Sequence, residues 1–466
     1  MHSSSLQRKE EVRLLNLIKN EYIKIFKKKG TIIWIIVAIL ACFGYQFMMK
    51  MYNENESMYM YDSNMTVKGM ITDYESMYEG KMTGDDKKEY DYWKLADSLG
   101  IEKTTDIRIN ILSQLVDEYR KNNNTDDLTK LKDELKDADF KKWIGYLADK
   151  KYDKTYESKD IKDPVVNIYR YMQENNINSF DDWRVDKLVN LEGKQQTVEQ
   201  GIVGSDQASY DSAVNDMNVY RYAIDNNIEN YISSDISSKN YYGDDNNKYD
   251  NFWKGFASSA SMMNFVTIMM IVIAGGIVAN EFSAGTIKFL LINPVKRGKI
   301  LISKYLTSFS LSVIFSIGIY LINILIGIIL NGISSIGINF IGYSNGKVSQ
   351  YPGVIYILSL YAVYYVGVFV YMTMAFAVSS LLKSTAAAIG IGCGCMAFGS
   401  IGITILAALN QDWGRYLLFA NTDLVAISKG EGLFINMSLP FAITMLAIYT
   451  VIFMVTAYDG FVRREV

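Results

Sequence analysis

The chain has 466 residues, of which 50% are hydrophobic and 21% are charged, and its formal net charge is −3. The apolar residues gather in 31–49 and again after Met262, while the segment between them is polar and rich in charge. A single His, at position 2, excludes metal or triad chemistry that depends on histidine.

Six apolar stretches are long enough to cross the hydrocarbon core as helices, which satisfy their own backbone polar groups. None of them carries Asp, Glu, Lys or Arg near its middle. All three cysteines, Cys42, Cys393 and Cys395, lie inside these stretches and are interpreted as small packing residues. We therefore predict an all-α polytopic membrane protein with spans at 31–49, 262–280, 304–330, 353–381, 385–409 and 437–459.

Basic residues orient these spans, because short cytoplasmic loops collect Lys and Arg. The ends that we assign to the cytoplasm hold sixteen Lys and Arg residues, against three in the two short loops on the other side. We expect a bacterial plasma-membrane protein with both termini cytoplasmic and residues 50–261 extracellular. That outer segment has 28 basic and 41 acidic residues. The excess of acidic residues could attract cationic partners, but we favour the interpretation that it only keeps the segment soluble.

Residues 1–30 predict an amphipathic helix at the cytoplasmic membrane surface. Lys27, Lys28 and Lys29 at its end are expected to anchor it at the interface. The helix could be only an anchor, or it could also be a lever that touches a cytoplasmic partner. Its apolar stripe, at spacings of three and four, consists of Leu14, Leu17, Ile18, Glu21, Tyr22, Ile25 and Phe26.

The outer segment 50–261 is predicted to be a mainly α-helical domain. It contains one proline, Pro164, and repeated helical stripes such as Ile111, Leu112, Leu115 and Val116. Because it contains no cysteine, its own core must hold it together. At its end, Trp253 precedes the second span and is interpreted as an aromatic anchor at the membrane interface.

Residues 281–303 form the longest predicted cytoplasmic loop. Gly285–Ile292 could form a short helix that ends before Pro294, and a partner motor could grip such a helix. The alternative for Glu281 is an interfacial carboxylate without a coupling role. The basic residues Lys296, Arg297 and Lys299 would in either case be attracted to anionic lipid.

The fifth span carries Ala386, Gly390 and Gly394 at intervals of four. Such a stripe of small residues allows a second helix to approach closely. It could be the seam between two copies of the chain or a packing surface within one chain, and we favour packing within one chain.

Several of these residues resemble the signature that follows the second span in ABC-2 type transporter permeases. They are Glu281, the Gly285-Thr286 pair, the leucine-rich turn with Phe289 and Leu290, Pro294, Arg297 and Lys304. The resemblance implies that these residues couple the chain to a separate ABC ATPase subunit, which would bind ATP and Mg. It also implies a second permease copy, identical or not, an extracellular loop at 331–352, a re-entrant region at 410–436 and a cytoplasmic tail at 460–466.

The large insertion between the first two spans departs from sugar-exporting relatives, which have a short loop there. It is similar to the insertions of bacitracin or lantibiotic-immunity permeases and of sodium-export permeases. The resemblance therefore implies an exporter, and we favour an amphipathic peptide antibiotic as cargo, with resistance to antimicrobial peptides as the result.

The absence of several sequence motifs excludes some classes of function. The sequence has no phosphate-binding loop for ATP, so we predict a transport subunit that is not itself an enzyme and binds no cofactor or metal. It has no ionisable residue in mid-membrane, which disfavours a proton-coupled carrier, no peptidase motif, and no feature that indicates nucleic acid. The alternative is a sensor or mechanotransmission scaffold, linked to an ATPase, whose outer domain binds an extracellular ligand or a cell-wall enzyme without transport.

Overall fold

The computed structural model describes residues 2–59, 66–78, 81–104, 106–148, 168–201, 207–233, 250–286, 296–344, 346–428, 432–434 and 437–463. The chain divides into two compact units. We call Met1–Met49, Phe252–Ser335 and Val354–Val466 the membrane unit, and Lys50–Asn251 with Ile336–Gly353 the insert unit.

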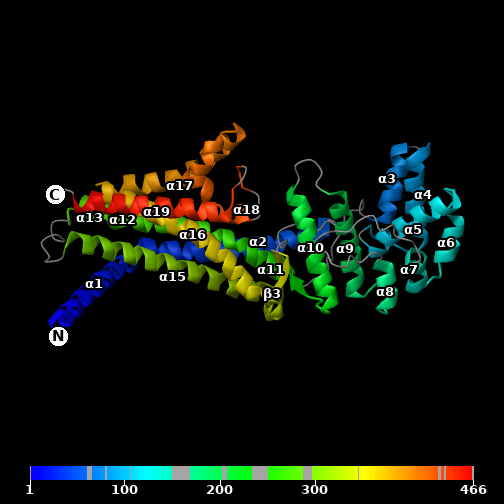
Figure 1. Cartoon of the computed structure of the whole chain (residues 1–466), viewed down its shortest axis with the longest axis horizontal. Coiled ribbons are helices and arrows are strands. Elements are labelled where there is room, and N and C mark those ends of the chain that lie inside the picture. Colours follow the sequence, from blue (N-terminus) through cyan, green and yellow to red (C-terminus); the bar gives the residue numbers. More distant parts are fainter. Residues whose placement is uncertain are drawn as a thin grey trace. The chain divides into compact units, whose positions relative to one another are not determined.

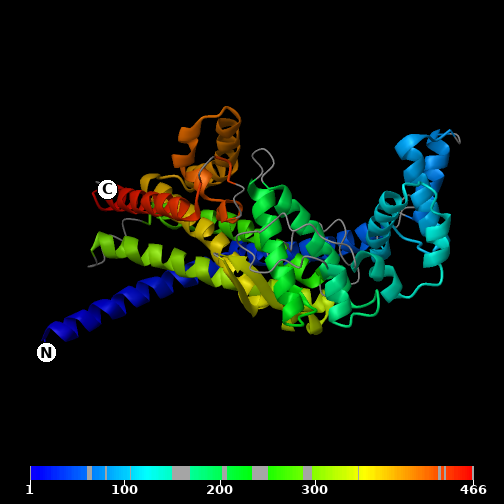
Figure 2. The same ribbon diagram turned by 45° about the vertical axis from the view of Figure 1, so that its right-hand side comes forward.

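The membrane unit contains six helices that are long and apolar enough to cross a membrane, at 29–51, 255–277, 297–331, 353–381, 385–408 and 439–462. They overlap all six predicted spans, so the chain is a mainly α-helical polytopic membrane protein, as predicted. Figures 1 and 2 show α12, α15, α16 and α19 running alongside one another. The helices that supply residues to this unit are α1 His2–Lys27, α2 Lys29–Tyr59, α11 Asp250–Ser258, α12 Met263–Ile277, α13 Ala279–Ser283, α15 Arg297–Asn331, α16 Gly353–Leu381, α17 Thr385–Ala408, α18 Leu424–Ser428 and α19 Leu439–Val462, with 3-10 helices η2 Ser259–Met262, η4 Asp412–Tyr416 and η5 Leu418–Asn421.

Two serines begin long helices of this unit. The Ser384 hydroxyl accepts a hydrogen bond from the Ala387 amide at the start of α17, and Ser438 does the same for Phe441 in α19. Each serine thus satisfies an amide that has no partner within its helix. The 35-residue α15 begins seven residues before the predicted third span. The expected loop 281–303 is therefore shorter, because residues 297–303 are helical.

The amphipathic stripe of α1 packs on α15. Ile25 is buried, the Tyr22 hydroxyl donates to Ser310 Oγ over 2.6 Å, and the rings of Phe26 and Phe315 lie 6.4 Å apart between centroids. The predicted helix therefore exists and uses its stripe to contact another helix. Its place at a membrane surface stays a prediction.

The insert unit is built from short helices around its own apolar core, which includes Leu112, Ile144 and Leu188. Two aspartates begin its longer helices: Asp106 and Asp182 accept hydrogen bonds from the amides of Arg108 and Arg184. The helices are α3 Val67–Tyr78, α4 Gly84–Ser98, α5 Ile107–Asn123, α6 Thr129–Leu135, α7 Phe140–Ala148, α8 Ile168–Glu174, α9 Trp183–Gln200 and α10 Gln207–Asp225.

A small sheet joins this unit and was not predicted. The segment expected to be a loop at 331–352 contains the 3-10 helix η3 Ile333–Gly337 and the antiparallel strands β2 Asn339–Ser344 and β3 Lys347–Pro352. β2 pairs in parallel with β1 Tyr231–Ile232. Ile341 of β2 packs with Val219 and Ala223 of α10, so the loop between two spans completes the insert unit.

The region expected to be re-entrant, 410–436, contains η4, η5 and α18, and residues 429–431 and 435–436 lie outside the described residues. Asn421 is buried and donates to the carbonyls of Arg415 and Leu417. The Tyr449 hydroxyl of α19 donates to the Tyr416 carbonyl over 3.1 Å. These short helices therefore pack on the membrane unit, and their depth in a bilayer stays a prediction.

Candidate functional site: a buried ionic cluster

Four charged side chains from three segments form one cluster, which we call the ionic cluster: Glu21, Lys24, Glu281 and Lys304. Lys304 Nζ lies 2.9 Å from Glu21 Oε1 and 3.3 Å from Glu281 Oε1. Lys24 Nζ lies 2.9 Å from Glu281 Oε1 and 3.4 Å from Glu21 Oε1. The cluster therefore joins α1, α13 and the first turns of α15, and its two carboxylates balance its two ammonium groups.

Burial distinguishes this cluster from ordinary surface ion pairs. The Lys304 side chain is 1% exposed, and those of Glu21 and Glu281 are 9% and 10% exposed. Only Lys24, with 52% of its side chain exposed, reaches solvent. Removing one member would leave a buried charge without its partner, which typically costs about 3–5 kcal/mol.

The helix is interrupted at this site, at Val278 between α12 and α13. Lys304 Nζ also donates to the Ile277 carbonyl over 3.0 Å, so its charge lies at the C-terminus of α12, where a cation is favourable. The amides of Val278 and Ala279 both donate to Ser379 Oγ. Lys304 and Ser379 therefore satisfy backbone groups that the break between the two helices would leave without partners.

Glu281 is held in its charged form. Burial by itself would raise the pKa of its carboxyl group, but the charge of Lys304, the hydroxyl of Thr286 and the ammonium of Lys24 outweigh burial and lower this pKa to about 2. The pKa of Lys24 is raised, because the favourable bonds to Glu281 and Glu21 outweigh the opposing effect of burial. Both groups stay charged at neutral pH.

Three of the predicted coupling residues meet in this site. Thr286 Oγ1 donates to Glu281 Oε2, and Lys304 binds the other oxygen of that carboxylate. Gly285 lies in the turn between Glu281 and Thr286 with φ +68°, a left-handed conformation that glycine adopts readily. The rest of the short helix expected at Gly285–Ile292, from residue 287 on, lies outside the described residues. The side chains of Glu281 and Lys304 are thus occupied within the chain.

The other predicted coupling residues are not part of the ionic cluster. Arg297 is the first residue of α15. Phe289, Leu290 and Pro294 lie outside the described residues. Glu21 and Lys24 were not predicted as site residues, although Glu21 is the one charged residue in the apolar stripe of α1, and that exception was the available signal.

The structure corrects the interpretation of Trp253. Its side chain is 0% exposed, and its ring lies 5.0 Å from that of Phe252 and 6.2 Å from that of Phe256, between centroids. Trp253 is therefore an interior residue and cannot anchor the chain in the headgroup region. Lys27, Lys28 and Lys29 are exposed where α1 meets α2, and their anchoring role stays a prediction.

The small-residue stripe also differs from our expectation. Ala386 and Gly390 are exposed and Gly394 is half-buried, and a Cβ added at either glycine would meet nothing within 4 Å. Close packing within the chain occurs instead at Gly392, where an added Cβ would lie 2.7 Å from Ile271 of α12. The helix turns a different face toward its neighbours, so the packing that we favoured within one chain is wrong for these residues.

Each comparison with known proteins matches about half of the chain. The chain is 33% identical over 217 residues to "Uncharacterized protein YhcI" of Bacillus subtilis (strain 168), covering 46% of this chain and 69% of that protein. It is 30% identical over 218 residues to "Uncharacterized membrane protein YdbK" of the same strain, covering 47% of this chain and 84% of that protein. No solved structure matches the chain. The profile of the family described as "Protein of unknown function (DUF2705)" matches residues 227–466, and the chain belongs to this family.

Proposed function

We propose that the chain is the transmembrane permease subunit of an ATP-driven exporter, powered by a separate ATPase subunit. The observation that carries this proposal is the ionic cluster. It fixes the turn 281–286, which resembles the coupling segment of ABC-2 type permeases, to α1, α12 and α15 at once. A force applied by a motor to this turn would therefore reach two spans and the N-terminal helix together.

The contact surface for the motor would be the exposed residues near the turn, because the buried carboxylate of Glu281 is occupied. Lys296 is exposed immediately before α15. Figure 1 shows α13, the start of α15 and the C-terminus at the same end of the membrane unit, which would be the cytoplasmic end. The exposed stripe of Ala386 and Gly390 would be the seam with a second permease copy.

The test is purification of the tagged chain from its native membrane, followed by mass spectrometry of the proteins that accompany it. We expect an ATPase with nucleotide-binding motifs. Lys296→Glu should reduce its recovery at least tenfold, whereas the matched variant Lys383→Glu, at an exposed residue between α16 and α17, should retain it. Absence of any ATPase from the wild-type preparation in mild detergent would contradict the proposal.

The cargo that we propose is an amphipathic peptide antibiotic. The corresponding test is ATP-dependent uptake of a labelled cationic peptide into inverted vesicles that contain the chain and its ATPase. A sensor or mechanotransmission scaffold would move no peptide. That second candidate is favoured by one observation: the insert unit has a continuous apolar core of its own and could bind a ligand as an independent module. Copurified ATPase without peptide transport would support it.

A further inference from the structure

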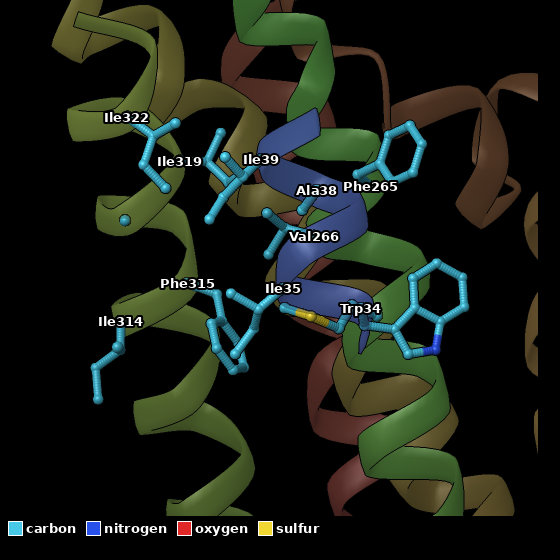
Figure 3. Close-up of a pocket in the computed structure, with 12 residues that line it drawn as sticks. Trp34, Ile35, Ala38, Ile39, Phe265, Val266, Ile314, Phe315, Ile319 and Ile322 are labelled. Atoms are coloured by element: carbon cyan, nitrogen blue, oxygen red, sulfur yellow. The ribbon is translucent and has the colours of Figure 1, made fainter. Parts of the chain in front are cut away.

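An apolar cavity of ≈ 170 Å³ lies among α2, α12 and α15 in the membrane unit. Figure 3 shows Ile39 of α2, Val266 of α12 and Ile319 of α15 pointing toward one another around it. Trp34 and Gly318 also line it. A dry cavity of about 150 Å³ holds a small apolar molecule such as benzene, so this space is large enough for a segment of a hydrocarbon chain.

The lining decides which chemistry can enter. Its side chains are all apolar, and a buried water molecule needs two to four polar partners. At the rim, Ile39 and Ile314 are 40% and 51% exposed, and both belong to helices that would face hydrocarbon. The material within reach of this opening is therefore an acyl chain.

Positively charged side chains near one end of the cavity would favour lipids with an anionic headgroup. Lys27, Lys28 and Lys29 are exposed where α1 meets α2. Lys29 precedes Ile35 of the cavity wall by six residues, about 9 Å of helical rise. Phe26, next to Lys27, packs on Phe315 of the same cavity wall. Three exposed ammonium groups thus lie at the depth of a headgroup whose chain fills the cavity, and they favour an anionic one.

We propose that this cavity binds one acyl chain of an anionic phospholipid, whose headgroup is held by Lys27, Lys28 and Lys29. The proposal does not rest on the export function, because it concerns the chain alone in a bilayer. It assigns one lipid molecule to the junction of α1 and α2, with its acyl chain in the cavity. This is more specific than a general attraction of the lysines to the membrane surface.

The test uses the fluorescence of Trp34. The full chain is reconstituted in phosphatidylcholine vesicles that contain a small fraction of phosphatidylglycerol brominated on its acyl chain, and the Trp34 signal is the difference between wild type and Trp34→Phe. We expect this signal to be quenched at a several-fold lower fraction of brominated phosphatidylglycerol than of brominated phosphatidylcholine. Equal quenching by the two lipids would overturn the proposal, since it would mean contact with bulk lipid only.

Variants separate the cavity from the headgroup site. Gly318→Leu fills the cavity, because an added Cβ there meets nothing within 4 Å, and it should abolish the preferential quenching. Gly402→Leu, at an equally open and exposed glycine on α17, should leave it unchanged. Changing the three lysines to Gln should lower the preference at least about fivefold. Ala38→Leu fills the cavity from the opposite wall, so if both filling variants fold and keep the preference, the proposal is wrong.

Discussion

The two units differ in the apolar side chains that they expose and in the polar side chains that they bury. In the insert unit, Leu112, Ile144 and Leu147 are 0% exposed, and charged residues cover the helices. In the membrane unit, Ile329 and Phe398 are 76% and 73% exposed, while hydroxyl and amide side chains are fully buried. The buried polar residues with 0–1% exposure include Ser303, Thr307, Ser308, Ser312, Asn323, Thr373, Ser379 and Ser380.

This difference shows what holds each unit together. Apolar burial away from water stabilises the insert unit by roughly 25 cal/mol per Å² of buried surface. Lipid removes that driving force between membrane helices, so close packing and hydrogen bonds must replace it. The Ser312 and Tyr365 hydroxyls lie 3.0 Å apart, and Gln46 Nε2 donates to Asn323 Oδ1 over 2.8 Å. Polar contacts therefore join the spans.

The largest expected effect tests the ionic cluster. Lys304→Met removes the ammonium group that both buried carboxylates share, and we expect the free energy of unfolding to fall by about 3–5 kcal/mol. The readout is thermal unfolding of the purified chain in detergent. The control is Arg463→Ala, which breaks an exposed pair with Asp459 and should change stability by about 1 kcal/mol or less. Similar small effects for both variants would show that the cluster is not stabilising.

The same cluster predicts a dependence on acid. Because the pKa of Glu281 is about 2 in the folded chain and 4.5 as an ordinary value, its contribution is fully present above pH 4.5 and is lost as the pH falls toward 2. Unfolding measured from pH 6 down to pH 3 should show this loss in wild type. The Glu281→Gln variant should be less stable than wild type at pH 6, and its stability should change less between pH 6 and pH 3. An unchanged slope in the variant would contradict the assignment.

Deletion of the same apolar atoms should destabilise the two units by very different amounts. Leu112→Ala leaves a cavity in the insert core and should cost about 2–5 kcal/mol. Leu325→Ala, at a 58% exposed residue of α15, should cost less than about 0.5 kcal/mol, because lipid fills the space. Hydrogen exchange followed separately for peptides of each unit measures both. Equal losses of stability in the two units would contradict this difference between them.

Helix contacts in the membrane unit should tolerate little added volume. Gly392→Leu places atoms against Ile271, and overpacking of this kind costs about 1–3 kcal/mol. Gly402→Leu, on the same helix and open, is the matched control in the same thermal assay. If Gly392→Leu were as stable as the control, the close crossing of α12 and α17 would be wrong.

The smallest effect concerns a helix start in the insert unit. Asp182→Ala removes the carboxylate that accepts the Arg184 amide, and an N-cap of this kind contributes about 1 kcal/mol. Amide exchange should become faster in the first turn of α9, with the rest of the unit little changed. Asp181→Ala, whose side chain does not cap α9, serves as the control.

Hydropathy predicted the six spans because a helix in lipid exposes its apolar residues wherever it lies, so no tertiary knowledge is needed. The stripe of α1 was equally visible, since its period is local. The sheet was missed, because β1 has two residues and its partner β2 lies more than a hundred residues later. The Asn345-Gly346 dipeptide was a hairpin signal that we did not use. Which glycines pack closely depends on how a helix is rotated, and sequence spacing does not determine that.

The ionic cluster also sets an order of events during synthesis. Glu21 and Lys304 are separated by 283 residues. At about 5–20 residues per second, the ribosome needs roughly 15–60 s to make the lysine after the glutamate. During that interval residues 50–251 of the insert unit are made, Glu281 follows only near its end, and α1 lacks Lys304 throughout. Helix α1 is thus made long before it can attain its full set of ion pairs, which requires the first turns of the third span.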